Sequence, residues 1–244
     1  MESTSYIALS YQTGVERQMD VVANNIANMN THGFKGERMM FIEHVSESLG
    51  NNRIKKTPLS YVRDIATMTD ISAGQLEKTG NSLDLAITGE GFFVVQTENG
   101  ERFTRNGRFK LDGEGQIVTQ TGDPLLSDGG NPFFLSPEDT NITISRNGTV
   151  STNNGELGKI RLVKFDAPQK LLRMADEYFS STTPPIDVES PEVEQGMLEG
   201  ANVKPILEMA KLIEINRRYD RTRKFIERED ERIRAMLKEY GMTA

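Results

Sequence analysis

The chain has 244 residues and a formal net charge of −7, because 36 Asp and Glu outnumber 29 Lys and Arg. The absence of Cys excludes a disulfide framework, a thiolate metal site and a cysteine nucleophile, and two His leave little for a histidine-ligated metal. The acidic balance argues against general nucleic-acid binding, which needs a positive field. A hydrophobic share of 36% is low for one compact globule of this length. Composition therefore predicts a structural or interaction protein rather than an enzyme, with no cofactor and no metal.

The N-terminal segment carries no recognisable targeting signal. Glu2 follows Met1, and no apolar signal-peptide core comes after it. The longest apolar stretches, such as Phe92 to Val95, are too short to span a bilayer. We therefore expect a chain that does not span a membrane and that is either cytosolic or exported without a cleaved signal peptide.

The first predicted element is a helix from about Thr4 to Asn28. Its apolar residues recur at spacings of three and four, which places one narrow stripe on one face. The stripe consists of Tyr11, Val15, Met19, Val22, Ile26 and Met29. Gly33, a typical turn residue, lies just beyond the end of the helix. Residues 36–73 are expected to be an extended or irregular connection, with a brief helical continuation over Phe41 to Val45.

The middle of the chain, where most of the 21 glycines lie, is predicted to consist of β-hairpins. Asn99-Gly100 suits a type I′ turn between strands Phe92–Thr97 and Glu101–Arg105, because both turn residues tolerate positive φ. Asn147-Gly148 marks a second hairpin of the same kind. Short strands at regular spacing predict a small antiparallel sandwich or barrel over residues 74–183.

Residues 184–195, which include two adjacent prolines, are expected to be a linker to a last helix from Lys204 to about Tyr240. One heptad row of this helix is apolar and the other is largely polar. The first row is Leu212, Tyr219, Ile226, Ile233 and Tyr240, and the second is Met209, Asn216, Arg223, Asp230 and Leu237. Because polar residues interrupt the seam, a free-standing two-stranded coiled coil is disfavoured, and specific packing among several neighbours is favoured. A solvated helix with one apolar stripe is the alternative.

The two end helices are expected to pair with each other as a coiled-coil-like hairpin. Residues 1–35 and 196–244 would form this helical domain, and the all-β antiparallel domain would be inserted between them, which makes the fold class α+β. Such a hairpin would leave apolar residues on its outer faces, namely Ile7, Leu9, Leu207, Ile213 and Phe225. Exposed apolar surface marks interaction sites, so assembly with copies or partners is expected.

Other motifs that could carry chemistry are incomplete. Gly89-Glu90-Gly91 lacks the third glycine of a dinucleotide-binding loop, because Val94 stands in its place. Asp112 to Gly115 lacks the alternating ligands of a calcium loop and is interpreted as a turn. The basic run from Arg217 to Lys224 is interleaved with acidic residues, which favours ion pairs over nucleic-acid binding.

Three segments resemble a known family. Ala23 to Lys35 closely resembles the N-terminal signature of the bacterial flagellar rod and hook proteins. Gly89 to Val95, followed by Phe103 to Gly107, looks like the start of their first β domain, and Gln195 to Val203 with Glu208-Met209 resembles their C-terminal signature. The chain length is similar to that of a rod subunit of the proximal type, with the distal-rod type as the alternative.

The resemblance implies a non-catalytic axial subunit of the flagellar basal body. Its terminal helices would pack into an inner tubular layer of the torque-transmitting rod, with the β domain on the outside, in the periplasm. Its partners would be other copies of itself, the proximal and distal rod proteins and the flagellar type III export apparatus. A candidate of a different class is a β-domain module that binds cell wall or glycan and carries a helical oligomerisation hairpin.

The predicted assembly residues lie in the two helices and in the turn after the first helix. They are Asn24, Asn25, Asn28, Asn30, Phe34, Leu212, Asn216, Tyr219, Arg223, Ile226, Asp230 and Ile233. The asparagines can satisfy backbone groups at the helix end, and Phe34 is a candidate anchor into a neighbouring subunit. No partner is predicted for Lys35.

Overall fold

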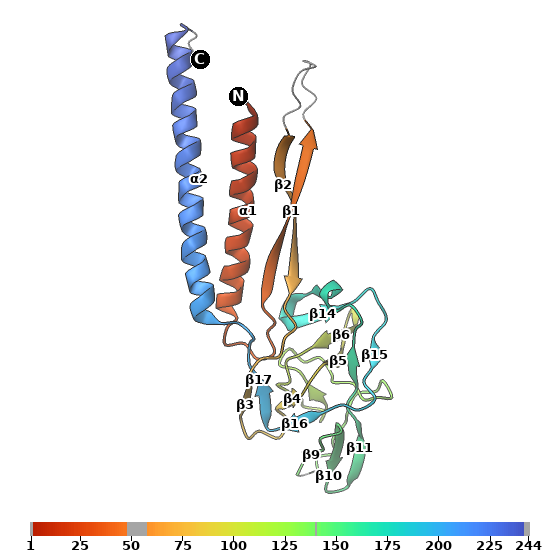
Figure 1. Cartoon of the computed structure of the whole chain (residues 1–244). Coiled ribbons are helices and arrows are strands. Elements are labelled where there is room, and N and C mark those ends of the chain that lie inside the picture. Colours follow the sequence, from red (N-terminus) through yellow and green to blue (C-terminus); the bar gives the residue numbers. More distant parts are fainter. Residues whose placement is uncertain (1, 48–57, 140, 242–244) are drawn as a thin grey trace. The chain divides into compact units, whose positions relative to one another are not determined.

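The computed structural model describes residues 2–47, 58–139 and 141–241, and these fall into two compact units (Figure 1). The helical unit takes its residues from the ranges 1–27, 37–68 and 204–244. The β unit takes its residues from the ranges 28–36 and 69–203. Helices and largely antiparallel strands together make the protein α+β, as the sequence predicts.

The helical unit contains α1 (Glu2–Ala27), α2 (Pro205–Glu239) and two long paired strands, β1 (Glu37–Glu47) and β2 (Pro58–Thr69). Both helices lie within two residues of their predicted bounds. They pack against each other along most of α1 and run in opposite directions, so that both chain ends lie at the same end of the pair (Figure 1). Neither described helix combines the length and apolar character needed to cross a membrane.

The core between α1 and α2 is small. Its buried members are Val15, Val22 and Ile215, and Met19, Ile26, Leu212 and Tyr219 pack against them partly exposed. Four residues of the stripe predicted for α1 and two of the first heptad row predicted for α2, Leu212 and Tyr219, therefore meet at this interface. Tyr11 is exposed, and Met29 lies beyond α1 in the β unit. Few apolar side chains of α1 and α2 whose burial is described are buried between the two helices.

The second heptad row predicted for α2 is wrong as the packing seam. Met209, Asn216, Arg223, Asp230 and Leu237 are exposed. The less exposed row is Glu208, Ile215, Thr222, Glu229 and Met236, again seven residues apart. Either row lies three or four residues from the Leu212 row, so spacing alone does not choose between them. Packing α1 on the Ile215 side buries Ile215 to 3% exposure and leaves the charged row in water.

The connection after α1 is more regular than predicted. The helical continuation over Phe41 to Val45 is wrong, because these residues lie within strand β1. Pairing with β2 along the opposite strand overrides the weak local helix signal.

The β unit is built from fifteen further strands in the described residues. They are β3 (Leu76–Lys78), β4 (Leu85–Ile87), β5 (Phe92–Thr97), β6 (Gly100–Thr104), β7 (Lys110–Leu111), β8 (Ile117–Val118), β9 (Thr143–Ile144), β10 (Thr149–Thr152), β11 (Gly155–Lys159), β12 (Leu162–Lys164), β13 (Leu172–Arg173), β14 (Tyr178–Ser180), β15 (Ile186–Asp187), β16 (Val193–Gln195) and β17 (Met197–Glu199). Two 3₁₀ turns, Pro168–Lys170 and Ala175–Glu177, flank β13.

One antiparallel sheet of six strands, in the order β13-β14-β6-β5-β12-β15, dominates the β unit. Strands β11, β10 and β9 form a second sheet, and the pairs β16-β4, β17-β3 and β7-β8 complete the unit. Both predicted hairpins are present, but the type I′ turns are wrong, because Gly100 and Gly148 have positive φ whereas Asn99 and Asn147 do not. Each turn lies one residue earlier than predicted, so that Gly100 is already the first residue of β6 and pairs with Thr97. The β5 side chains alternate between two apolar clusters, so that Phe93 lies in one and Phe92 lies in the other, in edge-on contact with neighbouring rings.

The predicted domain boundaries differ from the two units. Residues 184–195 are not a linker, because β15 pairs with β12 and β16 pairs with β4. Two prolines can directly precede β15 because it is an edge strand, where a missing N–H costs nothing. Residues 28–35 and 196–203, predicted to belong to the helical domain, lie in the β unit.

The seam on α2 predicts different costs for two apolar truncations. Ile215→Ala removes buried side chain and leaves a cavity, so it should destabilise the helical unit by about 2–5 kcal/mol. Met209→Ala, at an exposed position of the same helix, should cost about 0.5 kcal/mol or less. Thermal unfolding followed by circular dichroism at a helix band compares the two, and equal effects would contradict the assignment of the seam.

Candidate assembly site and its buried ion cluster

Three charged side chains meet inside the β unit, one from each of the three segments that resemble the flagellar family. Glu199 accepts from the Lys35 amine at 2.6 Å through Oε1 and from Nε of Arg105 at 2.5 Å through Oε2. All three residues are buried, with 1%, 5% and 2% exposure for Lys35, Arg105 and Glu199. A single carboxylate thus links the N-terminal segment, the first hairpin and the C-terminal segment.

Lys35 reaches the cluster because the turn before it runs against the rest of the β unit. The Gly33 N–H donates to the Glu199 backbone carbonyl at 2.7 Å. Gly33 has a φ of 73°, and a Cβ at this position would lie 2.3 Å from the backbone nitrogen of Asn106. Only glycine fits this approach without displacing backbone.

Arg105 lies one residue beyond β6 and holds the loop between β4 and β5. Its guanidinium donates to the carbonyls of Ile87 at 3.0 Å, of Gly89 at 2.6 Å and of Gly91. Together with the bond from Nε to Glu199, each of the three guanidinium nitrogens therefore donates to an oxygen, as a buried charge requires. Gly89 and Gly91, considered above for a phosphate loop, supply carbonyl oxygens to an arginine instead.

The cluster holds two buried cations and one buried anion, and burial affects the pKa of Lys35 and of Glu199. Burial lowers the pKa of the Lys35 amine, and the adjacent Glu199 carboxylate opposes this shift. Burial by itself would raise the pKa of Glu199, but attraction to Arg105 and Lys35 outweighs it and leaves that pKa below its ordinary value. The stabilisation from ionised Glu199 is therefore present above its ordinary pKa and is lost as the pH falls through the lowered value.

Backbone oxygens and amides complete the cluster. The Lys35 amine also donates to the Ser72 carbonyl at 2.8 Å, and Glu199 accepts from the Gly74 N–H at 2.7 Å. Asn202 extends the same pattern, since Oδ1 accepts from the Gly36 N–H at 2.7 Å and Nδ2 donates to the Ser72 carbonyl at 3.1 Å. The network joins residues 33–36, 70–74 and 199–202, which are the segments by which the chain enters and leaves the β unit.

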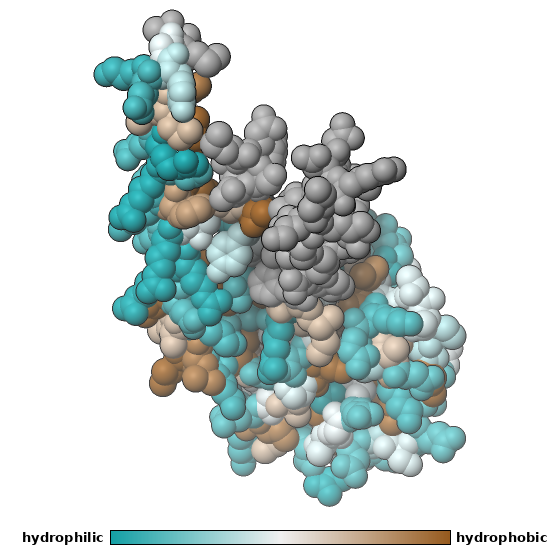
Figure 2. All heavy atoms as spheres, turned by 45° about the horizontal axis from the view of Figure 1, so that its top comes forward, coloured by the Kyte–Doolittle hydropathy of each residue, from teal (hydrophilic) through white to brown (hydrophobic). Residues whose placement is uncertain are grey.

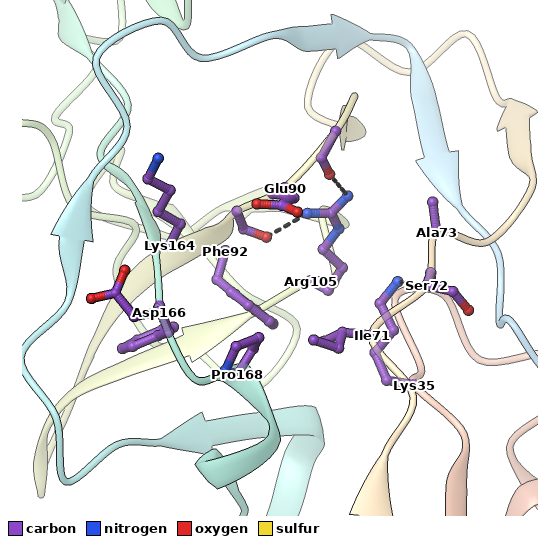
Figure 3. Close-up of a pocket in the computed structure, with 13 residues that line it drawn as sticks. Lys35, Ile71, Ser72, Ala73, Glu90, Phe92, Arg105, Lys164, Asp166 and Pro168 are labelled. Atoms are coloured by element: carbon purple, nitrogen blue, oxygen red, sulfur yellow. Dashed lines mark hydrogen bonds between the residues drawn. The ribbon is translucent and has the colours of Figure 1, made fainter.

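A pocket of about 670 Å³ lies beside the cluster within the β unit. Figure 3 shows Lys35 and Ser72 on one side of it and Phe92 and Lys164 on the other. Lys35 and Arg105 line it, but their donors are engaged by Glu199 and backbone carbonyls. Among the described residues, no three His, Asp or Glu side chains lie close enough together to hold a metal ion.

Phe34, predicted as an anchor into a neighbouring subunit, packs within this chain. Its ring is 1% exposed, and the Arg173 guanidinium carbon lies 4.0 Å from the ring centroid. Arg173 also donates to the Lys35 carbonyl at 3.1 Å. The ring is therefore part of the β unit's own interior, where it supports the backbone next to Lys35.

The four predicted asparagines have different surroundings. Asn25 is 4% exposed, and its side chain accepts from the Glu37 N–H at 2.9 Å and donates to the Glu37 carbonyl at 2.8 Å. Asn25 Nδ2 also donates to Glu208 of α2 at 3.4 Å. Asn28 accepts from the Thr31 hydroxyl at 3.4 Å and closes the turn after α1, whereas Asn24 and Asn30 are exposed.

The predicted residues of α2 fall into two groups. Leu212 and Tyr219 pack against α1, and Ile226 and Ile233 continue their row half-buried. Asn216, Arg223 and Asp230 are exposed, and the two charged residues form ion pairs within the helix, Arg223 with Glu227 at 3.1 Å and Asp230 with Arg234 at 2.8 Å. The second group is available for contacts outside this chain.

Sequence reasoning missed the ion cluster, although all its members stand in the quoted segments. Lys35 closes the N-terminal segment, Arg105 lies in Phe103 to Gly107, and Glu199 lies in Gln195 to Val203. The available signal was a basic residue in each of the first two segments and an acidic residue in the third. The sequence alone did not show that three segments so far apart converge.

Family models match three parts of the chain. The model described as "Flagella basal body rod protein" matches residues 8–35, and the "Flagellar hook protein FlgE/F/G D1 domain" matches residues 86–152. The "Flagellar basal body rod FlgEFG protein C-terminal" model matches residues 194–239. These ranges contain the three segments that meet at the ion cluster.

Whole-chain relatives carry the same description. A flagellar basal-body rod protein FlgF of Caulobacter vibrioides is 38% identical over 99% of each chain, and one of Mesorhizobium japonicum is 32% identical over 91% of each. A flagellar basal-body rod protein FlgG of Buchnera aphidicola is 32% identical over 92% of this chain and 96% of its own. The chain belongs to the flagellar basal-body rod protein family and is a structural subunit of the rod. Within that family it is of the FlgF type, because the FlgF relative matches at higher identity over nearly the full length.

The ion cluster predicts a large effect from removing one charge. Glu199→Gln leaves two buried cations without a counter-ion and should destabilise the β unit by about 3–5 kcal/mol. Glu194→Gln breaks a pair in which Arg146 is exposed and Glu194 is half-buried, and it should cost about 1 kcal/mol or less. Urea unfolding monitored by circular dichroism measures both, and a small loss for Glu199→Gln would show that the cluster does not stabilise the unit.

Glu177 predicts a pH-dependent stability. Its backbone is left-handed at a φ of 62°, its carboxylate accepts from Asn106 at 2.6 Å, and burial raises its pKa against the opposing effects of Asn106, Arg173 and His32. Such a group stabilises the fold fully below its unfolded pKa, near 4.5, and this contribution is lost as the pH rises through the folded value.

Glu177→Gln keeps the acceptor for Asn106 without the charge. The variant should therefore melt at a higher temperature than the parent near neutral pH, and the difference should vanish below a pH of about 4. Melting temperatures across this pH range test the expectation, with Glu114→Gln, an exposed carboxylate of the same unit, as the control. A constant difference at all pH values would exclude titration of Glu177 as its cause.

Proposed function

We propose that this rod subunit assembles through its terminal helices into the inner layer of the torque-transmitting rod, with the β unit on the outside. The observation that supports this most directly is the surface of α2. Only one stripe of the helix is covered by α1, and large apolar side chains remain exposed elsewhere on it (Figure 2): Ile206, Leu207, Met209, Ile213 and Phe225. A helix with so much uncovered apolar surface needs further helices around it.

Coiled-coil-like pairing of α1 and α2 is part of this proposal. The half-buried rows of α2 alternate at spacings of three and four, which is the heptad pattern. The exposed residues Asn216, Arg223 and Asp230 then supply polar contacts to neighbouring helices, and Asn24 and Asn30 supply contacts at the end of α1.

The ion cluster has a mechanical role in the proposal. Torque passing along a rod strains each subunit where the chain passes between its two units. The network around Glu199 holds residues 33–36, 70–74 and 199–202 together by charge-assisted hydrogen bonds rather than by a flexible linker. The segments by which the chain enters and leaves the β unit are therefore held in fixed positions relative to one another.

Export and location follow as further parts of the proposal. The subunit is exported by the flagellar type III apparatus, without a cleaved signal peptide, and joins the other rod proteins in the periplasm. The lack of Cys is compatible with assembly in an oxidising compartment, because no thiol can form a wrong disulfide. The role is mechanical and requires no catalytic group.

The direct experiment is mass spectrometry and electron microscopy of basal bodies purified from the bacterium that encodes this chain. The protein should be present in the rod, and its deletion should abolish motility and leave an incomplete rod. Finding the chain only outside basal bodies, bound to cell wall, would instead favour a glycan-binding module.

Charge reversal on α2 separates assembly from folding. Arg223→Glu breaks an exposed intrahelical pair worth about 0.3–0.5 kcal/mol, so the purified monomer should keep its circular dichroism spectrum. Incorporation into basal bodies should fall several-fold, because the position faces away from α1. Arg108→Glu, an exposed charge on the β unit, is the matched control. Unchanged incorporation of both variants would remove Arg223 from the assembly surface.

A further inference from the structure

Asn106-Gly107 combines a reactive sequence with an unusual environment. At an Asn-Gly pair the glycine nitrogen readily attacks the side-chain amide of the asparagine, because glycine has no side chain to hinder the approach. The chain has four such pairs, Asn99-Gly100, Asn106-Gly107, Asn147-Gly148 and Asn154-Gly155. The structure places them in different surroundings, so their reactivities should differ.

The N–H of Gly107 is buried without a hydrogen bond. Among the described residues, no oxygen accepts from it. Buried backbone N–H groups are almost always paired, so this one requires an explanation. At the other pairs, Gly148 donates to a backbone carbonyl at 2.8 Å, and Gly100 and Gly155 lie in paired strands. The nitrogen next to Asn106 is therefore not held by another group.

The side-chain amide of Asn106 is held at both of its ends. Oδ1 accepts from the Arg108 N–H at 3.1 Å, and Nδ2 donates to Oε2 of Glu177 at 2.6 Å. A donor at Oδ1 stabilises the negative charge that develops there when a nucleophile adds to Cγ. A carboxyl group at Nδ2 can protonate this nitrogen as it leaves. The amide thus lies between the two groups that assist its cleavage.

Glu177 is suited to this proton transfer. Burial raises its pKa against the opposing effects of Asn106, Arg173 and His32, so its protonated form persists to a higher pH than that of an ordinary glutamate. Asp176 and Glu177 both have a left-handed backbone, with φ of 57° and 62°. Residues other than glycine rarely adopt this conformation, and such strain is concentrated at functional sites.

A cavity of about 40 Å³ adjoins Asn106 within the β unit. It has room for a water molecule, and polar side chains that include Thr104, Thr119 and Tyr178 line it. Water, with the hydroxide in equilibrium with it, therefore has a place beside the amide.

We propose that Asn106-Gly107 is a self-modification site, at which Asn106 is converted to aspartate without an enzyme. Hydroxide takes the proton of the Gly107 nitrogen, the nitrogen bonds to Cγ of Asn106, and the bond from Cγ to Nδ2 breaks. Nδ2 leaves as ammonia with the proton of the Glu177 carboxyl, which water then returns, regenerating hydroxide. The succinimide ring so formed takes up one water molecule and opens to an acid. The reaction needs no partner and is independent of the proposed assembly.

Packing around Asn106 selects the product. The ring opens either to aspartate or to isoaspartate, and isoaspartate lengthens the main chain by one carbon. The main chain has no room for this, because a Cβ on Gly33 would collide with the Asn106 nitrogen and one on Gly107 with the Leu85 carbonyl. The folded protein should therefore yield aspartate. Its new carboxyl group then faces Glu177, and the two share a proton.

Peptide mapping by mass spectrometry tests the site. The purified full chain is kept folded at neutral pH, and conversion is followed at all four pairs in the same sample. Asn106 should convert several-fold faster than Asn99, Asn147 and Asn154, although it is less exposed than any of them. In denaturant the four rates should become similar, because only the fold distinguishes the pairs.

Glu177→Gln tests the proton transfer. The variant keeps an acceptor for Asn106 but has no acidic proton, so conversion there should slow by about tenfold or more. The other three pairs in the same sample should convert at the parental rate. Glu114→Gln, which changes an exposed carboxylate of the same unit, is the matched control and should leave all four rates unchanged.

Three results would overturn parts of this proposal. Faster conversion of the exposed pairs than of Asn106 would show that mobility alone decides the rate, and the site would be lost. Unchanged conversion of Asn106 in Glu177→Gln would remove Glu177 from the reaction. Isoaspartate as the main product would contradict the selection by Gly33 and Gly107.

Discussion

The carboxylate of Glu199 holds two buried cations that arrive from separate parts of the chain, Lys35 from the segment after α1 and Arg105 from the end of β6. Burying a cation without a partner costs several kcal/mol, so each of these positions depends on the others being filled. The hydrogen bonds from Gly74 and to Ser72 add backbone to the same network. The interior of the β unit is therefore complete only when both terminal segments are in place.

The helical unit is organised by a different constraint. The core between α1 and α2 has three buried members among the described side chains, Val15, Val22 and Ile215, which is little for helices of 26 and 35 residues. Apolar side chains at both ends of α2 remain exposed, and its middle is covered with paired charges. The β unit thus buries its own apolar interior, while α2 keeps large apolar side chains exposed.

Sequence periodicity located the helices and hairpins well because their signals are local. The stripe from Tyr11 to Ile26 marks α1, and Asn99-Gly100 marks the hairpin of β5 and β6, although the turn itself is Glu98-Asn99. The packing side of α2 could not be read in the same way, because the rows of Ile215 and Asn216 lie next to each other and only the position of α1 decides between them. Strand β15 was mistaken for a linker, since a two-residue edge strand after two prolines carries no periodic signal.

The ion cluster could not be predicted from the sequence, for a related reason. Lys35, Arg105 and Glu199 each look like an ordinary charged residue, and their shared role depends on pairings between segments far apart in the chain. The prediction that Phe34 anchors into a neighbouring subunit is wrong for the same reason. A ring just after a helix end could point outward, and only the fold shows that Arg173 covers it. Local sequence patterns predict helices and strands, whereas the partners of a buried charge depend on how distant segments are brought together.

The long sequence separation within the cluster also sets an order of events in time. Glu199 lies 164 residues after Lys35 and 94 residues after Arg105, so a chain that emerges from its N-terminus presents both cations long before their carboxylate. Contacts this distant in sequence form late and slowly. Until Glu199 arrives, closing the interior around two uncompensated cations is opposed by their desolvation. An incomplete chain is therefore hindered from folding its β unit. The subunit stays unfolded there until nearly its whole length has emerged.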